Sequence, residues 1–395
     1  MTKAENVMQR VHQEIMEHEG ISILELARTM GVQADSLRNI LRPLIKQRYL
    51  YHRRGEERVS FHPEFGRVVG IDLGGSHVHF ALADCRGKVL RDSNLKIRPE
   101  DGPEALIAQI VKGARAIAAR SGARLRAAAM GVPSPVDAER GVVTFAYNLP
   151  GWKDIYLRRE LEQKLRVPVM LENDCNLAAV GEHWQGVAKG VDNFVMIAIG
   201  TGTGSGVFVD GKLHRGRLGA AGEVYHMNLD WQRWADDFGD SGHFESVVSG
   251  IGIATQGHKV LPPGEGAAPS DLAAERDAYF VFEAFRQGNS QARAVLEKTF
   301  IMLGVAIANI IAILDPDLIV LGGGIAKGAP DFMLETTGKV VQHLYKESAP
   351  PIKLTALDDK AQTFGAISAA LTLTRQAIAR RLETWIPQAG EKVWF

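Results

Sequence analysis

The sequence predicts an α/β protein in which a small helical module with a terminal hairpin precedes a larger domain of two α/β lobes. Three observations support this prediction. Helical and hairpin patterns fill residues 1–62, buried strands with glycine-rich turns recur through the remainder, and these turns occur in two similar halves. The length of 395 residues agrees, because about 150 residues per domain predicts two or three units.

Composition limits the possible classes of protein. Lysine plus arginine and aspartate plus glutamate each number 46, so a uniformly basic nucleic-acid coat is excluded and any DNA-binding charge must be local. The two cysteines, Cys85 and Cys175, rule out a disulfide framework and suit a reducing compartment. The N-terminus lacks the apolar core of a signal peptide, and the apolar run at residues 300–314 is shorter than a membrane helix of ~20 residues. We therefore expect a cytoplasmic protein without membrane contact.

The N-terminal module begins with three helical patterns. Residues 4–18 have apolar side chains at helical spacing. Ser22, with Glu25 three residues later, predicts a capped second helix. Gly31 permits the sharp turn after that helix, and a third helix begins near Ala34. The pattern is helix, helix, turn, helix.

The third helix and the following hairpin contain most of the module's basic residues. Pro43 is expected to kink or break the helix, because proline removes a backbone donor. Residues 49–52, a turn at Gly55 and residues 59–61 predict a hairpin, which completes the order of a winged helix-turn-helix. The residues predicted to contact DNA are Gln33, Ser36, Arg38, Asn39 and Arg42 on the helix and Arg53 and Arg54 at the hairpin tip. The alternative is a helical dimerisation or docking module with a solvated basic face.

Three glycine-rich turns mark the larger domain, and each follows a buried strand. Free N–H groups in such turns can hold phosphate, and a carboxylate beside them can hold hydrated magnesium. The second turn returns as a strand, so neither a Rossmann site nor a Walker loop fits. Together the turns predict a nucleotide cleft between two lobes, and simple tight turns are the alternative. The residues predicted to bind nucleotide are Asp72, Gly74, Gly75, Ser76, Gly200, Thr201, Gly202, Thr203, Gly323 and Gly324.

A set of polar residues lies between and after these turns. A buried strand at residues 167–172 leads to Asn173 and Asp174 at the start of a helix. A carboxylate there can act as a general base toward a sugar hydroxyl, and Asn173 can bind another hydroxyl, although an isolated Asn-Asp pair is more often a helix cap. Glu223 and His226 add an acid and an imidazole in a glycine-rich segment. Polar side chains that converge in this way suit a polyol ligand.

Residues 67 to about 375 resemble the ROK family, which contains repressors and sugar kinases. The matching stretches are Ile71–Gly75, Asn148–Trp152, Glu172–Ala178, Gly200–Gly206, Gly219–His226 and Leu321–Gly324. The resemblance implies a two-lobed actin-like (ribonuclease H-like) sugar-kinase fold that closes on sugar and ATP, preceded by the winged helix of the family's repressor branch. It implies Asp174 as the kinase base. The sugar contacts that it implies are Asn148, Asn173, Asp174, Glu223, His226 and Glu245.

The expected domains follow from this resemblance. They are residues 1–62, a first lobe of residues 67–182 completed by a C-terminal helix at 365–395, and a second lobe of residues 183–364.

One segment departs from the family pattern. The family's zinc site uses a histidine and three cysteines, but residues 236–243 contain no cysteine, so we expect that zinc is not bound. The weak candidates for a remaining metal set are His226, Asp236 and His243. Packing of aromatic side chains is expected to hold the loop instead, from Tyr225, Trp231 and Trp234. Ser134 stands where the family often has glycine at the edge of the sugar.

The sequence therefore predicts a sugar-responsive transcriptional regulator, with operator DNA and a sugar as its partners. A repressor that assembles as a homodimer or homotetramer is expected, because paired half-sites match paired subunits. One alternative is an ATP-dependent sugar kinase that uses ATP and magnesium, with Asp174 as the base, but enzyme activity is not the principal expectation. Another is a sugar-binding protein that uses residues 1–62 for contacts between subunits.

Overall fold

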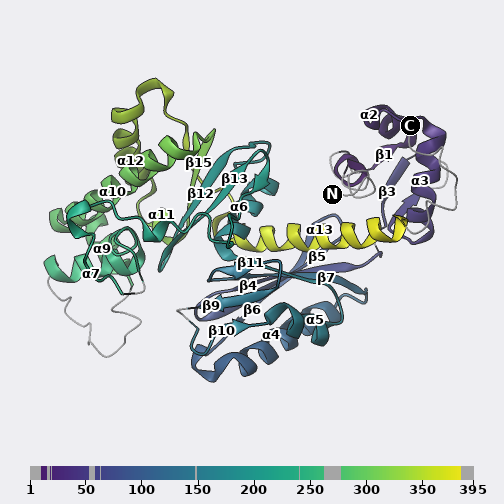
Figure 1. The fold of residues 1–395 in the computed structure, drawn as a ribbon, viewed down its shortest axis with the longest axis horizontal. Coiled ribbons are helices and arrows are strands. Elements are labelled where there is room, and N and C mark those ends of the chain that lie inside the picture. Colours follow the sequence, from purple (N-terminus) through teal and green to yellow (C-terminus); the bar gives the residue numbers. More distant parts are fainter. Residues whose placement is uncertain are drawn as a thin grey trace. The chain divides into compact units, whose positions relative to one another are not determined.

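The computed structural model describes residues 10–15, 18, 20–52, 58–62, 64–146, 149–239, 241–261 and 277–383. They form two compact units (Figure 1). The first unit contains the residues up to Val132, Ala138–Glu172 and the residues from Ala366 onward, and the second contains Pro133–Asp137 and Asn173–Gly365. The expected lobe boundary near residue 182 differs from this division, because helix α6 at residues 174–185 packs on the sheet of the second unit.

The N-terminal module has the predicted order of elements. Residues 10–15 are helical, and the elements that follow are β1 (Ile21–Ser22), α2 (Ile23–Met30), α3 (Ala34–Lys46), β2 (Leu50–His52) and β3 (Arg58–Phe61). The strands form one antiparallel sheet in the order β1-β3-β2. Ser22 and Glu25 form the capping box, with hydrogen bonds of 3.1 and 3.2 Å, and Gly31 ends α2 at φ 67°. Both local predictions are confirmed.

The expected break at Pro43 is wrong. Helix α3 continues through Pro43 to Lys46, and the Pro43 carbonyl accepts a hydrogen bond from the Gln47 N–H at 3.0 Å. Leu41 and Leu44 are fully buried on either side of the proline. Packing of these side chains therefore holds the last turn in place despite the missing backbone donor.

The first unit also contains a five-stranded sheet in the order β11-β7-β4-β5-β6. Its strands are β4 (Arg67–Leu73), β5 (His77–Asp84), β6 (Val89–Lys96), β7 (Leu125–Val132) and β11 (Val169–Asn173). The other elements of this unit are η1 (Pro99–Asp101), α4 (Gly102–Ala119), β9 (Val142–Phe145), β10 (Lys153–Ile155) and α5 (Leu157–Leu165). Strand β4 pairs antiparallel with β5 and parallel with β7, which combines a hairpin with a crossover connection.

The second unit repeats this arrangement in its own sheet, of order β14-β13-β12-β15-β16. The strands are β12 (Phe194–Ile199), β13 (Thr203–Val209), β14 (Lys212–Leu213), β15 (Leu318–Gly322) and β16 (Ile352–Leu354), with β8 (Val136–Asp137) outside this sheet. Strand β12 pairs antiparallel with β13 and parallel with β15, as β4 does with its neighbours. The two α/β lobes predicted from the recurring glycine turns are therefore present.

The helices of the second unit pack around two hydrophobic clusters, a large one that contains α10 (Ser290–Leu314) and a smaller one that contains α6 (Asp174–Gln185). The other helices are η2 (Val224–His226), η3 (Trp231–Arg233), α7 (Gly250–Val260), α9 (Tyr279–Arg286), α11 (Gly324–Gly328), α12 (Pro330–Tyr345), η4 (Lys346–Ser348) and η5 (Asp358–Lys360). By length and composition alone, α10 is long enough to cross a membrane. The apolar run at residues 300–314 predicted a shorter segment, because the helix begins ten residues earlier, at Ser290. Leu296, Phe300, Leu303 and Ile307 of α10 are fully buried in the core of the unit, as expected of a central helix in a globular domain.

The C-terminal helix α13 (Ala361–Glu383) is continuous over 23 residues (Figure 1). Its start precedes the expected residue 365, and residues 384–395 lie outside the described residues. Ile378 and Ala379 of this helix are buried in the same hydrophobic cluster as the N-terminal module.

Candidate functional site

The junction of β11 and α6 places Asn173 as a helix cap. The side-chain oxygen of Asn173 accepts a hydrogen bond from the N–H of Asn176 at 3.0 Å. Its amide nitrogen donates to the carbonyl of Ser134 at 3.3 Å. The helix-cap interpretation of Asn173 is therefore correct. Both ends of the amide have partners within the protein, so a sugar contact would have to share them.

Asp174 is the first residue of α6. Its carboxylate accepts a hydrogen bond from the N–H of Cys175 at 2.8 Å, which favours the ionised form. Burial has the larger, opposite effect and raises the pKa of Asp174 to about 6 from an ordinary value of 3.8. A carboxylate with this pKa can exchange a proton with a bound hydroxyl near neutral pH, as a general base must.

Glu223 precedes η2 and interacts with two other acids. Burial, followed by the negative charges of Asp174 and Glu245, raises the pKa of Glu223 to about 7 from 4.5. We call Asp174, Glu223 and Glu245 the carboxylate cluster. With pKa values of about 6 and about 7, the carboxyl groups of Asp174 and Glu223 exchange between protonated and ionised forms near neutral pH. A protonated carboxyl donates a hydrogen bond and an ionised one accepts, which matches sugar hydroxyls that do both.

Glu245 connects the cluster to the second glycine turn. One carboxylate oxygen accepts a hydrogen bond from the N–H of Thr203 at 2.7 Å, and the other accepts from the hydroxyl of Ser241 at 2.7 Å. A Cβ at Gly202 would lie 2.6 Å from the Glu245 Oε2 atom. A methyl group at position 202 would therefore displace the carboxylate of Glu245, whose hydrogen bond to Thr203 connects the turn to the cluster.

Two more glycines of this turn are explained by packing. A Cβ at Gly204 would lie 2.6 Å from the Sγ atom of Cys175, and one at Gly206 would lie 2.6 Å from the Cβ atom of Ala179. Both glycines allow α6 to approach β13 closely. A bound nucleotide is not needed to account for either position.

The start of the turn is different, because it is open. No atom lies within 4 Å of a Cβ built on Gly200, and Thr201 is exposed. Thr203 is buried and its hydroxyl donates to the carbonyl of Val248, so that side chain is already engaged. Of the residues predicted here to bind nucleotide, Gly200 and Thr201 are the ones whose surroundings leave room for a ligand.

The third turn joins β15 to α11. Gly323 has φ +88°, and a Cβ there would lie 2.3 Å from the carbonyl oxygen of Ile199, so only glycine fits. Gly324 has no atom within 4 Å of its Cβ position. This turn therefore also combines a glycine required by packing with one that is open.

The remaining predicted nucleotide residues lie in the first unit, at the turn between β4 and β5. Asp72 is the penultimate residue of β4, and the N–H of Gly74 donates to the carbonyl of His77 at 2.9 Å to close the turn. Gly75 is exposed with open space around its Cβ position. The hydroxyl of Ser76 lies 2.8 Å from the Nδ1 atom of His77.

The predicted metal candidates do not form a metal site in the described residues, where no group of three or more His, Cys, Asp and Glu could hold an ion. His226 is exposed beside the ring of Tyr225. His243 is buried, and its Nδ1 atom accepts a hydrogen bond from the N–H of Leu229 at 3.3 Å. The Nδ1 atom of His243 is therefore already occupied by a backbone group. The pKa of His243 is lowered, chiefly because the side chain is buried.

The expected packing of the loop by tryptophans is wrong, because Trp231 and Trp234 are each 80% exposed. Phe238 stacks on His243 instead, at 5.3 Å between ring centroids. The guanidinium of Arg233 lies 4.8 Å from the centre of the Phe238 ring and donates to Asp236 at 2.7 Å. A stack of cation, phenyl and imidazole thus orders the segment in which the family has cysteines.

The predicted DNA-contacting face of α3 is exposed, opposite the buried Leu37, Leu41 and Leu44. The exposed or partly exposed side chains on this face are Gln33, Ser36, Arg38, Asn39, Arg42 and Lys46. Arg38 forms an ion pair with Asp35 at 2.7 Å. Arg53 and Arg54 at the predicted hairpin tip, and the predicted sugar contact Asn148, lie outside the described residues.

Part of the basic patch seen in the sequence is neutralised. Arg48 pairs with Glu64 at 2.8 Å, and Arg58 donates to the carbonyl of Gly20 at 2.9 Å. Glu64 follows the hairpin in the sequence. Among the residues that the structure describes in this module, the positive charge available to phosphates therefore lies mainly along α3.

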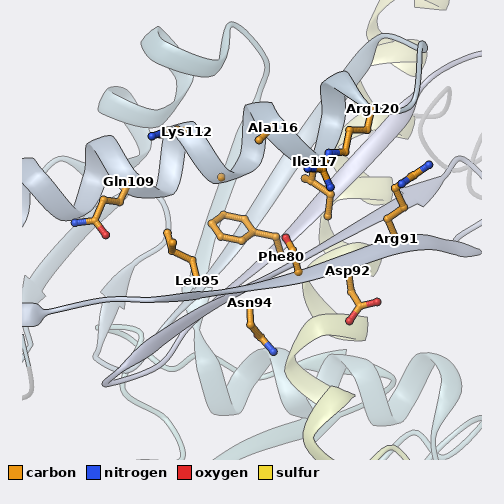
Figure 2. Close-up of a pocket in the computed structure, with 12 residues that line it drawn as sticks. Phe80, Arg91, Asp92, Asn94, Leu95, Gln109, Lys112, Ala116, Ile117 and Arg120 are labelled. Atoms are coloured by element: carbon orange, nitrogen blue, oxygen red, sulfur yellow. The ribbon is translucent and has the colours of Figure 1, made fainter.

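A separate cavity of about 630 Å³ lies between α4 and β6, over the ring of Phe80 (Figure 2). Arg91 on β6, Lys112 on α4 and Arg120 directly after α4 line it, together with Leu95 and other residues of β6 and α4. None of the residues predicted to bind sugar, nucleotide or DNA lines this cavity.

With this geometry established, similarity to known proteins identifies the family. The model of the ROK family matches residues 68–373. The chain belongs to the ROK family. A putative xylose repressor from Caldicellulosiruptor sp. (strain Rt8B.4) is 26% identical over 377 residues, which cover 91% of this chain and 93% of the relative. A glucokinase from Halalkalibacterium halodurans is 30% identical over 291 residues, which cover 72% of this chain and 87% of the relative.

A solved structure agrees with the fold of this ROK protein. A ROK family transcriptional regulator described as a homolog of the E. coli MLC protein matches 95% of this chain and 97% of its own, with a TM-score of 0.79 and 23% identity. The likeness covers more of the chain than the ROK model does. The predicted actin-like sugar-kinase fold of the ROK family is thereby confirmed.

Proposed function

We propose that this ROK protein is a sugar-responsive transcriptional repressor. The observation on which this proposal mainly depends is the N-terminal module, with its exposed α3 face above a buried leucine core. The xylose repressor relative matches 91% of the chain, more than residues 68–395 can supply, so that match extends into the module. The glucokinase relative matches 72% of the chain, which the ROK region alone can account for.

Operator binding is proposed to occur through α3. Arg42 and Lys46 are exposed on this helix, and neither has an ion pair or hydrogen bond in the described part of the chain. Arginine and lysine at such positions neutralise DNA phosphates, while Gln33 and Asn39 can reach base edges. An even assembly with twofold symmetry would present two such helices to a palindromic operator. We propose that the protein acts in the cytoplasm.

The sugar is proposed to bind at the carboxylate cluster. Its mixture of donors and acceptors suits a polyol, and Glu245 fixes the adjacent turn. Asn148, Asn173 and His226 stay proposed contacts of the same ligand, and no metal is proposed there. A ligand that binds one state of the protein better than another shifts the DNA-binding equilibrium by that difference in affinity.

Sugar phosphorylation is a second candidate function. It is favoured by Asp174, which stands at the start of α6 with a pKa of about 6. In the second unit, open positions at Gly200 and Gly324 and the exposed Thr201 are the proposed contacts of ATP. In the first unit, Gly75 is a proposed phosphate contact and Asp72 the proposed magnesium ligand. A regulator that transfers phosphate slowly would combine both functions.

The proposal is tested by reversing one charge on α3. DNA that binds the purified protein is first selected from a random-sequence library, and its affinity is measured by fluorescence anisotropy at fixed salt. Arg42→Glu should weaken binding at least about 30-fold, because it loses phosphate contacts and adds repulsion. Arg120→Glu, directly after α4, is the matched control, since Arg120 is also exposed and has no ion pair or hydrogen bond among the described residues. Equal affinity of Arg42→Glu and wild type would refute the assignment of α3 as the DNA-contacting helix.

A further inference from the structure

Helix α13 has different partners at its two ends. Residues 361–365 belong to the second unit, and the residues from Ala366 onward belong to the first. The helix is uninterrupted across this division. Each end of α13 therefore makes its contacts within a different unit.

The first turn of α13 packs directly against the backbone of α6. A Cβ at Gly365 would lie 1.8 Å from the carbonyl oxygen of Leu177 on α6. A Cβ at Gly181 on α6 would lie 2.1 Å from the carbonyl oxygen of Ala361. The two helices thus meet through reciprocal glycine contacts one turn apart, with no side chain between their backbones.

Helix α6 is also the helix that presents Asp174. Its first turn includes Cys175, whose sulfur lies against Gly204 of β13, and Ala179 lies against Gly206. Close contacts of this kind leave little freedom for independent movement, because packed interiors cannot deform by small amounts without cost. A shift of α6 on ligand binding would therefore be felt at Ala361 and Gly365.

The other end of α13 is part of the hydrophobic core of the N-terminal module. Ile378 and Ala379 are buried in one cluster with Leu37 and Leu41 of α3. Ala377, on the opposite face of α13, is exposed. The module therefore shares its core with a helix more than 300 residues later in the chain.

Polar contacts reinforce this end of the interface. The imidazole of His12 and the hydroxyl of Tyr49 are buried and hydrogen-bonded at 2.9 Å. Arg375 of α13 acts electrostatically on both groups, and its own side chain donates to Thr372 at 2.8 Å. Burial has the largest effect on the pKa of each group, and Arg375 lies close enough to His12 and Tyr49 for its positive charge to act in the lowering direction on both.

We propose that α13 transmits movement between the carboxylate cluster and the DNA-binding module. It is fixed to α6 through Gly365 and completes the core behind α3 through Ile378 and Ala379. Displacement of α6 moves α13 along with it and changes the support of α3. The biological purpose of this coupling rests on the proposed function, but the coupling itself is a mechanical property that can be measured without DNA or sugar.

The test displaces one end of α13 and observes the module at the other. Gly365→Ala places a methyl group against the Leu177 carbonyl and must push the first turn of α13 away from α6. Gly338→Ala on α12 is the matched control, because it is the same change in a helix with no atom within 4 Å. Hydrogen–deuterium exchange is followed by mass spectrometry in the full-length protein, without ligand.

We expect exchange in peptides covering α2 and α3 to be about tenfold faster in Gly365→Ala than in wild type, together with faster exchange in α6. The Gly338→Ala variant should match wild type in α2 and α3. Faster exchange in α6 with unchanged exchange in α2 and α3 would overturn the proposal. Since neither operator nor sugar is present, that outcome would leave the proposed function untouched.

A second variant covers the case in which Gly365→Ala does not fold. Ile378→Ala removes buried methyl groups from the module side of α13, and exposed Ile313→Ala on α10 is its control. Ile378→Ala should accelerate exchange in α2 and α3, whereas Ile313→Ala should not. Identical exchange in both variants would show that α13 does not support the module, and the proposal would fall.

Discussion

Replacement of Glu223 by glutamine should stabilise the second unit in a pH-dependent way. The pKa of Glu223 rises from 4.5 in the unfolded chain to about 7 in the folded protein, because of burial and the charges of Asp174 and Glu245. The folded state therefore binds more protons than the unfolded state between these two values. Stability is consequently lost as the pH rises from 4.5 through 7, and it stays reduced above 7.

The magnitude follows from the size of the rise in pKa. At about 1.4 kcal/mol per unit of pKa, a rise from 4.5 to about 7 corresponds to about 3.5 kcal/mol. Glu223 is partly exposed, so solvent screening reduces the expected effect to about 1.5 kcal/mol. For a unit of this size, that corresponds to a rise in melting temperature of about 3–6 °C.

The assay is thermal unfolding of wild type and Glu223→Gln at pH 8 and pH 5, without ligand. The variant should melt higher than wild type at pH 8, and the difference should shrink to about a quarter of that value at pH 5, where the unfolded-state carboxyl group is already largely ionised. Exposed Glu347→Gln in the same unit is the matched control and should change neither melting temperature. A gain for Glu223→Gln that is equal at both pH values, or a loss at pH 8, would refute the reasoning about the carboxylate cluster.

Three further predictions concern the glycine turn, catalysis and metal. Gly202→Ala should weaken sugar binding at least about tenfold in calorimetry, because its methyl group displaces Glu245, whereas Gly200→Ala should leave sugar binding unchanged. Equal effects of the two substitutions would show that the position of Glu245 does not matter for sugar binding. If the protein phosphorylates a sugar, Asp174→Asn should lower turnover at least about 100-fold in a coupled ATP assay while sugar binding persists, and unchanged turnover would exclude Asp174 as the base. Treatment with a chelator should change neither melting temperature nor sugar affinity, and stoichiometric zinc lost together with stability would show that His226 and His243 bind metal.

Local sequence signals were sufficient to predict much of the structure of the N-terminal module. Ser22, Glu25 and Gly31 act through hydrogen bonds or torsion angles within one turn, so their spacing predicts their structure. The break expected at Pro43 failed because that reasoning used the backbone alone. Burial of Leu41 and Leu44 by the rest of the module outweighs the lost hydrogen bond.

The site required contacts that link distant parts of the chain. Asn173 and Asp174 were found by their position between a strand and a helix. The partners that orient these side chains are distant in the sequence. Ser134 forms a hydrogen bond with Asn173 and Thr203 forms one with Glu245, and the two residues of each pair are about 40 positions apart. No spacing rule predicts such pairs. The basic residues near the third helix are also less available than the sequence suggests, because Arg48 pairs with Glu64 after the hairpin.

The central claim is that the sugar site controls DNA binding through the N-terminal module, and one titration tests it most directly. Random-sequence DNA is selected on the full-length protein, and the affinity for the enriched sequence is measured by fluorescence anisotropy at fixed salt, with and without saturating sugar from a panel that includes xylose and glucose. We predict a palindromic enriched sequence whose affinity changes at least about fivefold with one sugar of the panel, a change that is lost in a Glu245→Ala variant. Failure to enrich any sequence, or an affinity that no sugar alters although a sugar binds at the carboxylate cluster, would contradict the account.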